Sequence, residues 1–276
     1  MYIFTDIDNT LNEKNKTRKE EINPCIKSLF YKLIKKIKIG VATTRGFFRA
    51  QKLMKKCLNS YYVTLNGGEI YDNKGNFIIG FPLSKKEKNE IINIIKVNHN
   101  NIKLLAYYYF AQKYGKVYIK TNKKEEIEKF FENYYYTFKN KKDITNNIDI
   151  FLDSFLKNEL SMIEIIVKNS KILKKIKIPF LLNWCIDKNC IFINHRKIDK
   201  GYALKKLIKL KKIKLKKEDD LILIGDSITD VKMVNKFKNA KKILVNNKQY
   251  LKYFNFFVKN PKELCSFLNN FFMIQK

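Results

Sequence analysis

Two pairs of carboxylates, each placed directly after an apolar run, are the residues in this sequence best suited to chemistry. Asp6 and Asp8 follow the first apolar run of the chain, and Asp226 and Asp230 follow another one near its end. Neighbouring carboxylates repel each other unless a proton or a cation relieves them, and their oxygens suit a hard cation such as Mg²⁺. If the two pairs meet in the fold, they predict a Mg²⁺ site. Taken alone, the first pair is explained equally well by an Asx turn, and the alternative for the second pair is an N-capped helix start.

Two weaker signals accompany the acids. Thr43 and Thr44 lie between a small apolar run and a predicted helix, where a hydroxyl group and a helix N-terminus suit a phosphate oxygen. For this segment taken alone, a plain helix N-cap is the favoured explanation. Lys200 stands just before another predicted helix, although a single Lys carries no weight in a chain so rich in Lys.

The elements that must position these residues alternate between strand and helix. In the first part of the chain, we expect strands at residues 2–5, 39–43 and 61–65, with helices after Asn23-Pro24 and at 47–57. The alternation resumes near the end of the chain, with helices at 201–213 and 229–237 and strands at 221–224, 243–245 and 256–258. This order predicts an α/β fold with a Rossmann-like core, in which helices cover both faces of a parallel sheet. Ligand sites of such sheets lie at the carboxyl ends of the strands, which is where the acids fall.

The pattern changes between the two parts of this core. A hairpin is expected at residues 69–81, and Ser84 with Glu87 predicts a capping box ahead of a helix. Paired strands and a further helix at 125–135 then favour an α+β module with an antiparallel sheet. We therefore predict a core domain at residues 1–82 and 197–276, interrupted by an inserted α+β domain at residues 83–196.

In this order, and after these strands, the motifs resemble those of the haloacid dehalogenase superfamily of phosphohydrolases. The family's D-x-D-x-T motif is matched at Asp6, Asp8 and Thr10, its hydroxyl motif at Thr43, its lysine motif at Lys200, and its G-D-x-x-x-D motif at Gly225, Asp226 and Asp230. The insert resembles the large α/β cap of the Cof-like (type IIB) branch, which also shows segments similar to residues 42–45 and 66–68. Thr44 stands where Gly is usual, and Ser227 and Thr229 depart from the branch's G-D-G-x-N-D pattern, so the loops around the substrate can differ in shape.

The resemblance implies a Mg²⁺-dependent phosphatase. Asp6 would attack phosphorus and carry the phosphoryl group as an aspartyl-phosphate, while Asp8 would protonate the leaving alcohol and then activate water. The resemblance further assigns Mg²⁺ to Asp6, the carbonyl of Asp8, Asp226 and Asp230, the phosphoryl oxygens to Thr43, Thr44 and Lys200, and substrate binding to Arg45 and Asn66.

The expected substrate is a small phosphorylated metabolite, with a sugar phosphate favoured. A phosphomutase of the same superfamily would share every motif but would keep the phosphoryl group. A non-catalytic binding module would need a broken nucleophile position, whereas Asp6 is present. A nucleic-acid binder would show a steep salt dependence of binding. The sequence contains no recognisable motif of a nucleic-acid-binding domain.

The net charge of +31 also raises the question of nucleic acid. Only four of the 57 Lys and Arg residues are Arg, the residue that makes bidentate contacts with phosphate and guanine, and the lysines occur in almost every segment. We interpret the charge as a compositional bias, which disfavours nucleic-acid binding as the main function.

The five cysteines form no CxxC pair, no secretory signal precedes the first motif, and no apolar run approaches the ~20 residues of a membrane helix. These features favour a cytoplasmic protein with reduced thiols and no membrane association. The sequence gives no indication of the oligomeric state.

Overall fold

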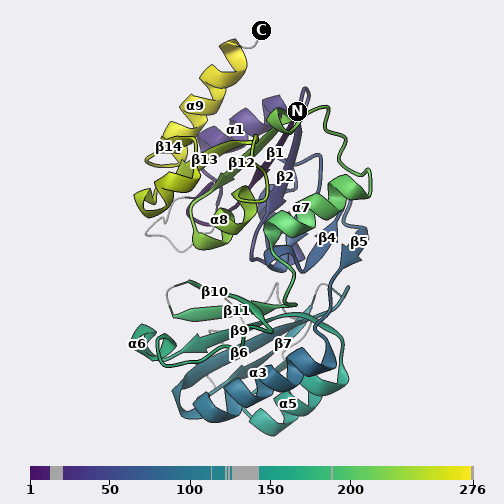
Figure 1. Cartoon of the computed structure of the whole chain (residues 1–276), viewed down its shortest axis with the longest axis vertical. Helices are drawn as coiled ribbons and strands as arrows, with labels where there is room; N and C mark the ends of the chain where they lie inside the picture. Colours follow the sequence, from purple (N-terminus) through teal and green to yellow (C-terminus); the bar gives the residue numbers. More distant parts are fainter. Residues whose placement is uncertain are drawn as a thin grey trace. The chain divides into compact units, whose positions relative to one another are not determined.

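The computed structural model describes residues 1–12, 21–112, 114–121, 123, 125, 143–187 and 189–274. These residues form two units (Figure 1). Unit 1 comprises residues 1–79 and 199–276, and unit 2 comprises residues 80–198.

Unit 1 is built on an eight-stranded sheet with the order β14-β13-β12-β1-β2-β3-β4-β5. Its strands are β1 (Tyr2–Thr5), β2 (Lys38–Ala42), β3 (Tyr62–Thr64), β4 (Glu69–Tyr71), β5 (Phe77–Gly80), β12 (Leu221–Gly225), β13 (Lys241–Val245) and β14 (Phe256–Val258). The six strands from β14 to β3 are paired in parallel, and β4 pairs antiparallel with β3. The carboxyl ends of β1 and β12 therefore lie side by side at one edge of the sheet.

Helices pack on both faces of this sheet because successive strand residues point to opposite sides. Ile3 joins a core with α1 (Pro24–Leu33), α2 (Phe47–Met54) and α9 (Pro261–Ile274), whereas Phe4 joins a core with α7 (Lys200–Lys209) and α8 (Ile228–Val234). Short 3-10 turns complete the unit at Leu65–Gly67, Glu218–Asp220 and Lys248–Tyr253. The predicted Rossmann-like parallel core is confirmed.

Unit 2 is an α+β module around a six-stranded sheet with the order β10-β11-β9-β6-β7-β8. Its elements are α3 (Lys85–Asn98), a 3-10 turn at His99–Asn101, β6 (Ile102–Tyr109), β7 (Gly115–Ile119), β8 (Ile144–Thr145), α5 (Ile148–Lys157), β9 (Leu160–Val167), α6 (Ser170–Leu173), β10 (Asn183–Asp187) and β11 (Cys190–Asn194). Among the described residues of this unit, the strand pairs are antiparallel except for β7 with β8. The predicted capping box of Ser84 and Glu87 is present at the start of α3. The helix predicted at 125–135 lies outside the described residues.

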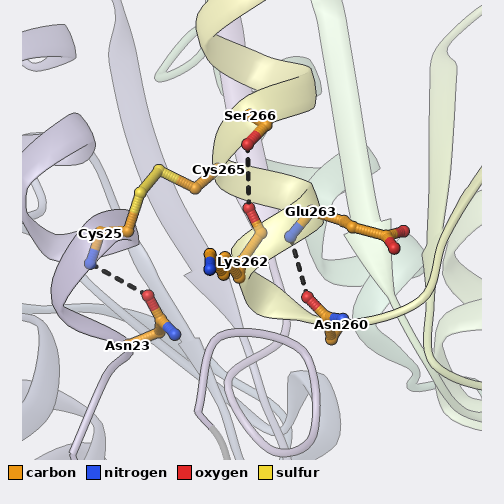
Figure 2. Close-up of a disulfide and its surroundings, with 7 residues drawn as sticks. All are labelled: Asn23, Cys25, Asn260, Lys262, Glu263, Cys265 and Ser266. Atoms are coloured by element: carbon orange, nitrogen blue, oxygen red, sulfur yellow. Dashed lines mark hydrogen bonds between the residues drawn. A yellow bond between two sulfur atoms is a disulfide. The ribbon is translucent and has the colours of Figure 1, made fainter.

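A disulfide joins Cys25, in the first turn of α1, to Cys265 in α9 (Figure 2). The two residues are 240 positions apart in the sequence, and their Cα atoms lie 6.1 Å apart because α1 and α9 pack side by side. The expectation of reduced thiols is therefore wrong for these two residues. Cys57, Cys185 and Cys190 are buried and form no disulfide.

No helix among the described residues has the length and apolar character needed to cross a bilayer.

Candidate active site

Three carboxylates meet at the carboxyl edge of the sheet in unit 1. Asp6 follows β1 and Asp226 follows β12, and the backbone N–H of Asp6 donates to Ile224 O at 2.9 Å across the two strands. Asp230 reaches the same place from the first turn of α8. One carboxylate oxygen from each of the three lies within 4.8 Å of the others, and all three side chains are buried. The two acidic motifs at opposite ends of the sequence thus share one point in space.

Lys200 supplies a buried cation between two of these acids. Its ammonium nitrogen lies 2.7 Å from Asp230 Oδ1 and 3.1 Å from Asp6 Oδ1, and its side chain is 0% exposed. Burial alone would lower the pKa of Lys200, but the carboxylates of Asp230 and Asp6 outweigh burial and raise it. Lys200 is therefore charged at any physiological pH, and it offsets part of the negative charge.

Asp230 is held by donors on both of its oxygens. Oδ1 takes the bond from Lys200, and Oδ2 accepts from the backbone N–H groups of Asp226 and Ser227 and from Ser227 Oγ at 2.6 Å. Gly225 is required beside it, because a Cβ there would overlap the Asp230 side chain. Asp230 consequently fixes the loop after β12 and orients Lys200.

Asp6 and Asp226 have more oxygen lone pairs available. Asp6 Oδ1 is close to Lys200 but is not aligned to accept a hydrogen bond, and Asp226 Oδ1 accepts one from Thr10 Oγ1 at 3.0 Å. Burial, together with the nearby carboxylates, raises the pKa of Asp6 to about 7 and that of Asp226 to about 8. A divalent cation would relieve this repulsion and keep both groups ionised. Buried carboxylate oxygens of this kind fit a hard cation such as Mg²⁺.

Asp8 lies apart from that group and is bound by Arg45. Arg45 Nε donates to Asp8 Oδ2 at 2.7 Å and Nη2 donates to Asp8 Oδ1 at 2.5 Å, while Arg45 itself is buried. Burial would raise the pKa of Asp8, but the hydrogen bonds and charge of Arg45, with the charge of Arg49, lower it. Asp8 is therefore held as a carboxylate.

The turn after β2 brings the remaining predicted residues to the same edge. Thr43 is fully buried, and its Oγ1 accepts from the backbone N–H of Arg45 at 3.2 Å. The carbonyl of Thr43 accepts from the N–H of Asn66, whose φ of 54° is left-handed. Gly67 follows with φ of 96° and lies so close to Asp199 that a side chain would overlap the Asp199 carbonyl. The turn is thus fitted against the start of α7, which carries the buried lysine.

Thr44 is half-buried in this turn, and its contact with a phosphate remains a prediction.

Several residues near the site were not identified from the sequence. Asn12 accepts from the N–H of Asn9 at 2.8 Å and donates to Asp8 Oδ1 at 3.4 Å, and Asn246 Nδ2 donates to the carbonyl of Asn9 at 2.7 Å. These polar side chains shape the loop after β1 without belonging to a motif. Arg49 could have been found, because Arg is scarce in this chain and two of its four Arg residues lie four positions apart.

Comparison with known proteins identifies the family and the fold of this chain. Residues 3–259 match the family model described as haloacid dehalogenase-like hydrolase. An uncharacterised protein of Mycoplasma capricolum is 26% identical over 252 residues, which cover 87% of this chain and 89% of that protein.

Solved structures show the same fold. A haloacid dehalogenase-like hydrolase from Bacteroides thetaiotaomicron has a TM-score of 0.73 at 14% identity, with 98% of each chain covered. A haloacid dehalogenase-like hydrolase from B. subtilis has a TM-score of 0.71 at 16% identity, with 96% of this chain and 97% of that chain covered. A sugar phosphatase described as haloacid dehalogenase subclass IIB has a TM-score of 0.74 at 14% identity, with 98% of each chain covered.

The matched range contains all four motifs from which the resemblance was inferred, and the neighbours share the fold of the whole chain. The resemblance is confirmed: the chain belongs to the haloacid dehalogenase-like hydrolase family.

Proposed function

We propose that this hydrolase is a Mg²⁺-dependent phosphatase that removes the phosphoryl group of a small metabolite through an aspartyl-phosphate on Asp6. One observation carries the proposal. Oxygens of Asp6, Asp226 and Asp230 lie within 4.8 Å of one another, and buried Lys200 contacts two of these acids. This arrangement can bind a cation and a phosphoryl group side by side.

The chemistry divides between Asp6 and Asp8. A carboxylate oxygen of Asp6 attacks phosphorus, the bond from phosphorus to the ester oxygen breaks, and Asp8 gives its proton to the departing alcohol. Asp8, now a carboxylate, takes a proton from water as that water attacks phosphorus, which releases phosphate and restores Asp6.

Positive charge must balance the phosphoryl oxygens during both steps. Lys200 and the hydroxyls of Thr43 and Thr44 are the proposed phosphoryl-binding groups. Asp6 and Asp226, with the carbonyl of Asp8, would hold Mg²⁺ directly, and Asp230 would support a ligand water. When bound, Mg²⁺ supplies charge neutralisation that lets an anionic phosphate approach these acids.

The substrate proposed here is a sugar phosphate or a similar small ester. Support comes from the structural neighbour described as a sugar phosphatase. Arg45 and Asn66 are proposed to bind the substrate from unit 1, and Arg45 must then release Asp8 so that Asp8 can carry a proton. We propose that unit 2 acts as the cap that selects the substrate.

A screen of phosphorylated metabolites, with p-nitrophenyl phosphate included, tests the proposal. We expect phosphate release that requires Mg²⁺, stops with a chelator and returns when Mg²⁺ is added back. Absence of release from every ester would contradict the proposal. Transfer of the phosphoryl group to a second hydroxyl without free phosphate would indicate a phosphomutase instead.

A further inference from the structure

Besides the candidate active site, unit 1 has a concentration of lysines at the end of its sheet where the parallel strands begin. This amino-terminal edge is opposite the edge that carries the carboxylates. The segment from 205 to 217 contains eight Lys and no acidic residue. This density of Lys is well above that of the whole chain, in which 53 of 276 residues are Lys.

Hydrogen bonds bring this segment to the starts of the first strands. The N–H of Lys214 donates to Tyr2 Oη at 3.4 Å, and Tyr61 Oη donates to the carbonyl of Lys212 at 3.1 Å. Lys38 is paired with Tyr2 across β1 and β2. We define the basic edge by six exposed lysines from these segments, which are Lys38, Lys211, Lys212, Lys214, Lys216 and Lys217.

Helix dipoles explain only part of this concentration. Helices α1, α2 and α7 all end at this edge, and lysines near a helix C-terminus offset the partial negative charge there. Lys32, Lys52 and Lys209 fit that role. The effect fades within one turn, whereas Lys214, Lys216 and Lys217 lie more than one turn beyond the end of α7. Those lysines need another explanation.

Intramolecular ion pairs do not neutralise the positive charge of the basic edge. Among the described residues, the basic edge forms one ion pair, Lys217 with Asp219 at 3.9 Å, and both side chains are largely exposed. The neighbouring Glu218 is directed elsewhere, since its Oε2 accepts from the N–H of Asn239. Like charges held close together in this way attract a polyanion.

We propose that the basic edge binds the phosphate backbone of a nucleic acid without reading its sequence. Lys is a flexible point charge that suits such contacts, and the absence of Arg from the edge disfavours recognition of bases. A bilayer fits less well, because membrane attachment needs an apolar face beside the charge. Among the described residues at this end of the sheet, the exposed large apolar side chains are Tyr31 in α1, Leu210 after α7 and Phe256 at the start of β14, which belong to three separate elements.

The test compares two triple variants with the same change of charge. Lys212→Gln, Lys214→Gln and Lys216→Gln neutralise the basic edge, and Lys168→Gln, Lys171→Gln and Lys174→Gln neutralise three exposed lysines of unit 2. Fluorescence anisotropy with a labelled single-stranded RNA of mixed sequence gives the affinity as a function of salt. Hydrolysis of p-nitrophenyl phosphate reports whether each variant is folded, and circular dichroism does so if there is no hydrolysis.

We expect the edge variant to bind RNA about tenfold more weakly at low salt, with a salt slope lower by about 2, because three phosphate contacts are lost. The unit 2 variant should bind like the unaltered protein. Equal weakening of both variants would overturn the proposal, because net charge alone would then explain binding. Absence of RNA binding, or an edge effect seen only with phosphatidylserine vesicles, would also overturn it.

Discussion

The guanidinium of Arg45 binds both carboxylate oxygens of Asp8, at 2.7 Å from Nε to Oδ2 and 2.5 Å from Nη2 to Oδ1. This pair keeps Asp8 ionised, although the proposed first step needs Asp8 to donate a proton. The resting site therefore holds the acid in its unreactive form. A substrate that draws Arg45 away would free Asp8 to take up the proton.

Replacing Arg45 with Ala should shift the pH dependence of phosphate release. Arg45 lowers the pKa of Asp8, so its removal raises that pKa and leaves more of the enzyme with Asp8 protonated at a given pH. The alkaline limb of kcat/KM should move to higher pH. Arg45→Lys, which keeps the charge but not the paired hydrogen bonds, should give an intermediate shift. An unchanged alkaline limb in Arg45→Ala would show that Arg45 does not act through Asp8.

Replacing Lys200 with Met should damage both stability and turnover. Two buried carboxylates would lose their shared cation, and breaking a buried ion pair costs about 3–5 kcal/mol. Loss of a charge that stabilises the transition state should also lower kcat by at least about 100-fold. Urea unfolding and phosphate release measure the two effects. As a control, Lys209→Met on the exposed side of the same helix should cost less than about 1 kcal/mol and leave kcat unchanged.

Asp226→Asn and Asp230→Asn should have opposite effects on the metal-free protein. The pKa of Asp226 is raised to about 8, so the folded state holds a proton that the unfolded chain, with a pKa near 3.9, gives up. Stability from this group is present at low pH and is lost as the pH rises from about 4 to about 8. Asp226→Asn should remove that loss, and so stabilise the metal-free protein at pH 8 while it abolishes the Mg²⁺-dependent rise in Tm.

Asp230→Asn should destabilise the protein at every pH, because Asp230 accepts from Lys200, from Ser227 Oγ and from two backbone N–H groups. Thermal unfolding of both variants, with and without Mg²⁺, checks the contrast. Equal destabilisation by the two changes would contradict the division of roles between the two acids.

Removing the disulfide should lower stability without altering the site. The bond between Cys25 and Cys265 closes a loop of 240 residues, for which the chain-entropy model gives about 5 kcal/mol. Cys25→Ser with Cys265→Ser should therefore unfold at lower urea concentration, while kcat at 25 °C stays the same. Cys57→Ser, at a cysteine that forms no disulfide, serves as the control for the loss of a thiol. If reduction of the unaltered protein leaves its unfolding curve unchanged, the crosslink does not contribute.

The sequence predicted those features that depend on local patterns. The apolar runs that precede Asp6 and Asp226 are strands, as predicted, and the two strands pair in parallel in the sheet. The predicted ends of these two strands therefore correctly placed the carboxylates of Asp6 and Asp226 at the carboxyl edge of the sheet.

Features that depend on tertiary contacts were not predictable. The pairing of Arg45 with Asp8 depends on the path of the turn after β2, and the disulfide depends on the packing of two helices from opposite ends of the chain. Helix α7 was predicted to reach residue 213 but ends at Lys209. Lys211 adopts a left-handed φ of 56°, and the N–H of Lys212 donates back to Leu207, so the helix ends in a Schellman motif without the glycine that usually marks one.

The most direct test of the account is the identity of the residue that carries the phosphoryl group during turnover. Rapid acid quench with Mg²⁺ and substrate, followed by mass spectrometry of the peptides, should find the phosphoryl group on the peptide that contains Asp6. Asp6→Asn should fold normally, carry no phosphoryl group and release no phosphate. A phosphoryl group on another residue, or full turnover in Asp6→Asn, would contradict the account.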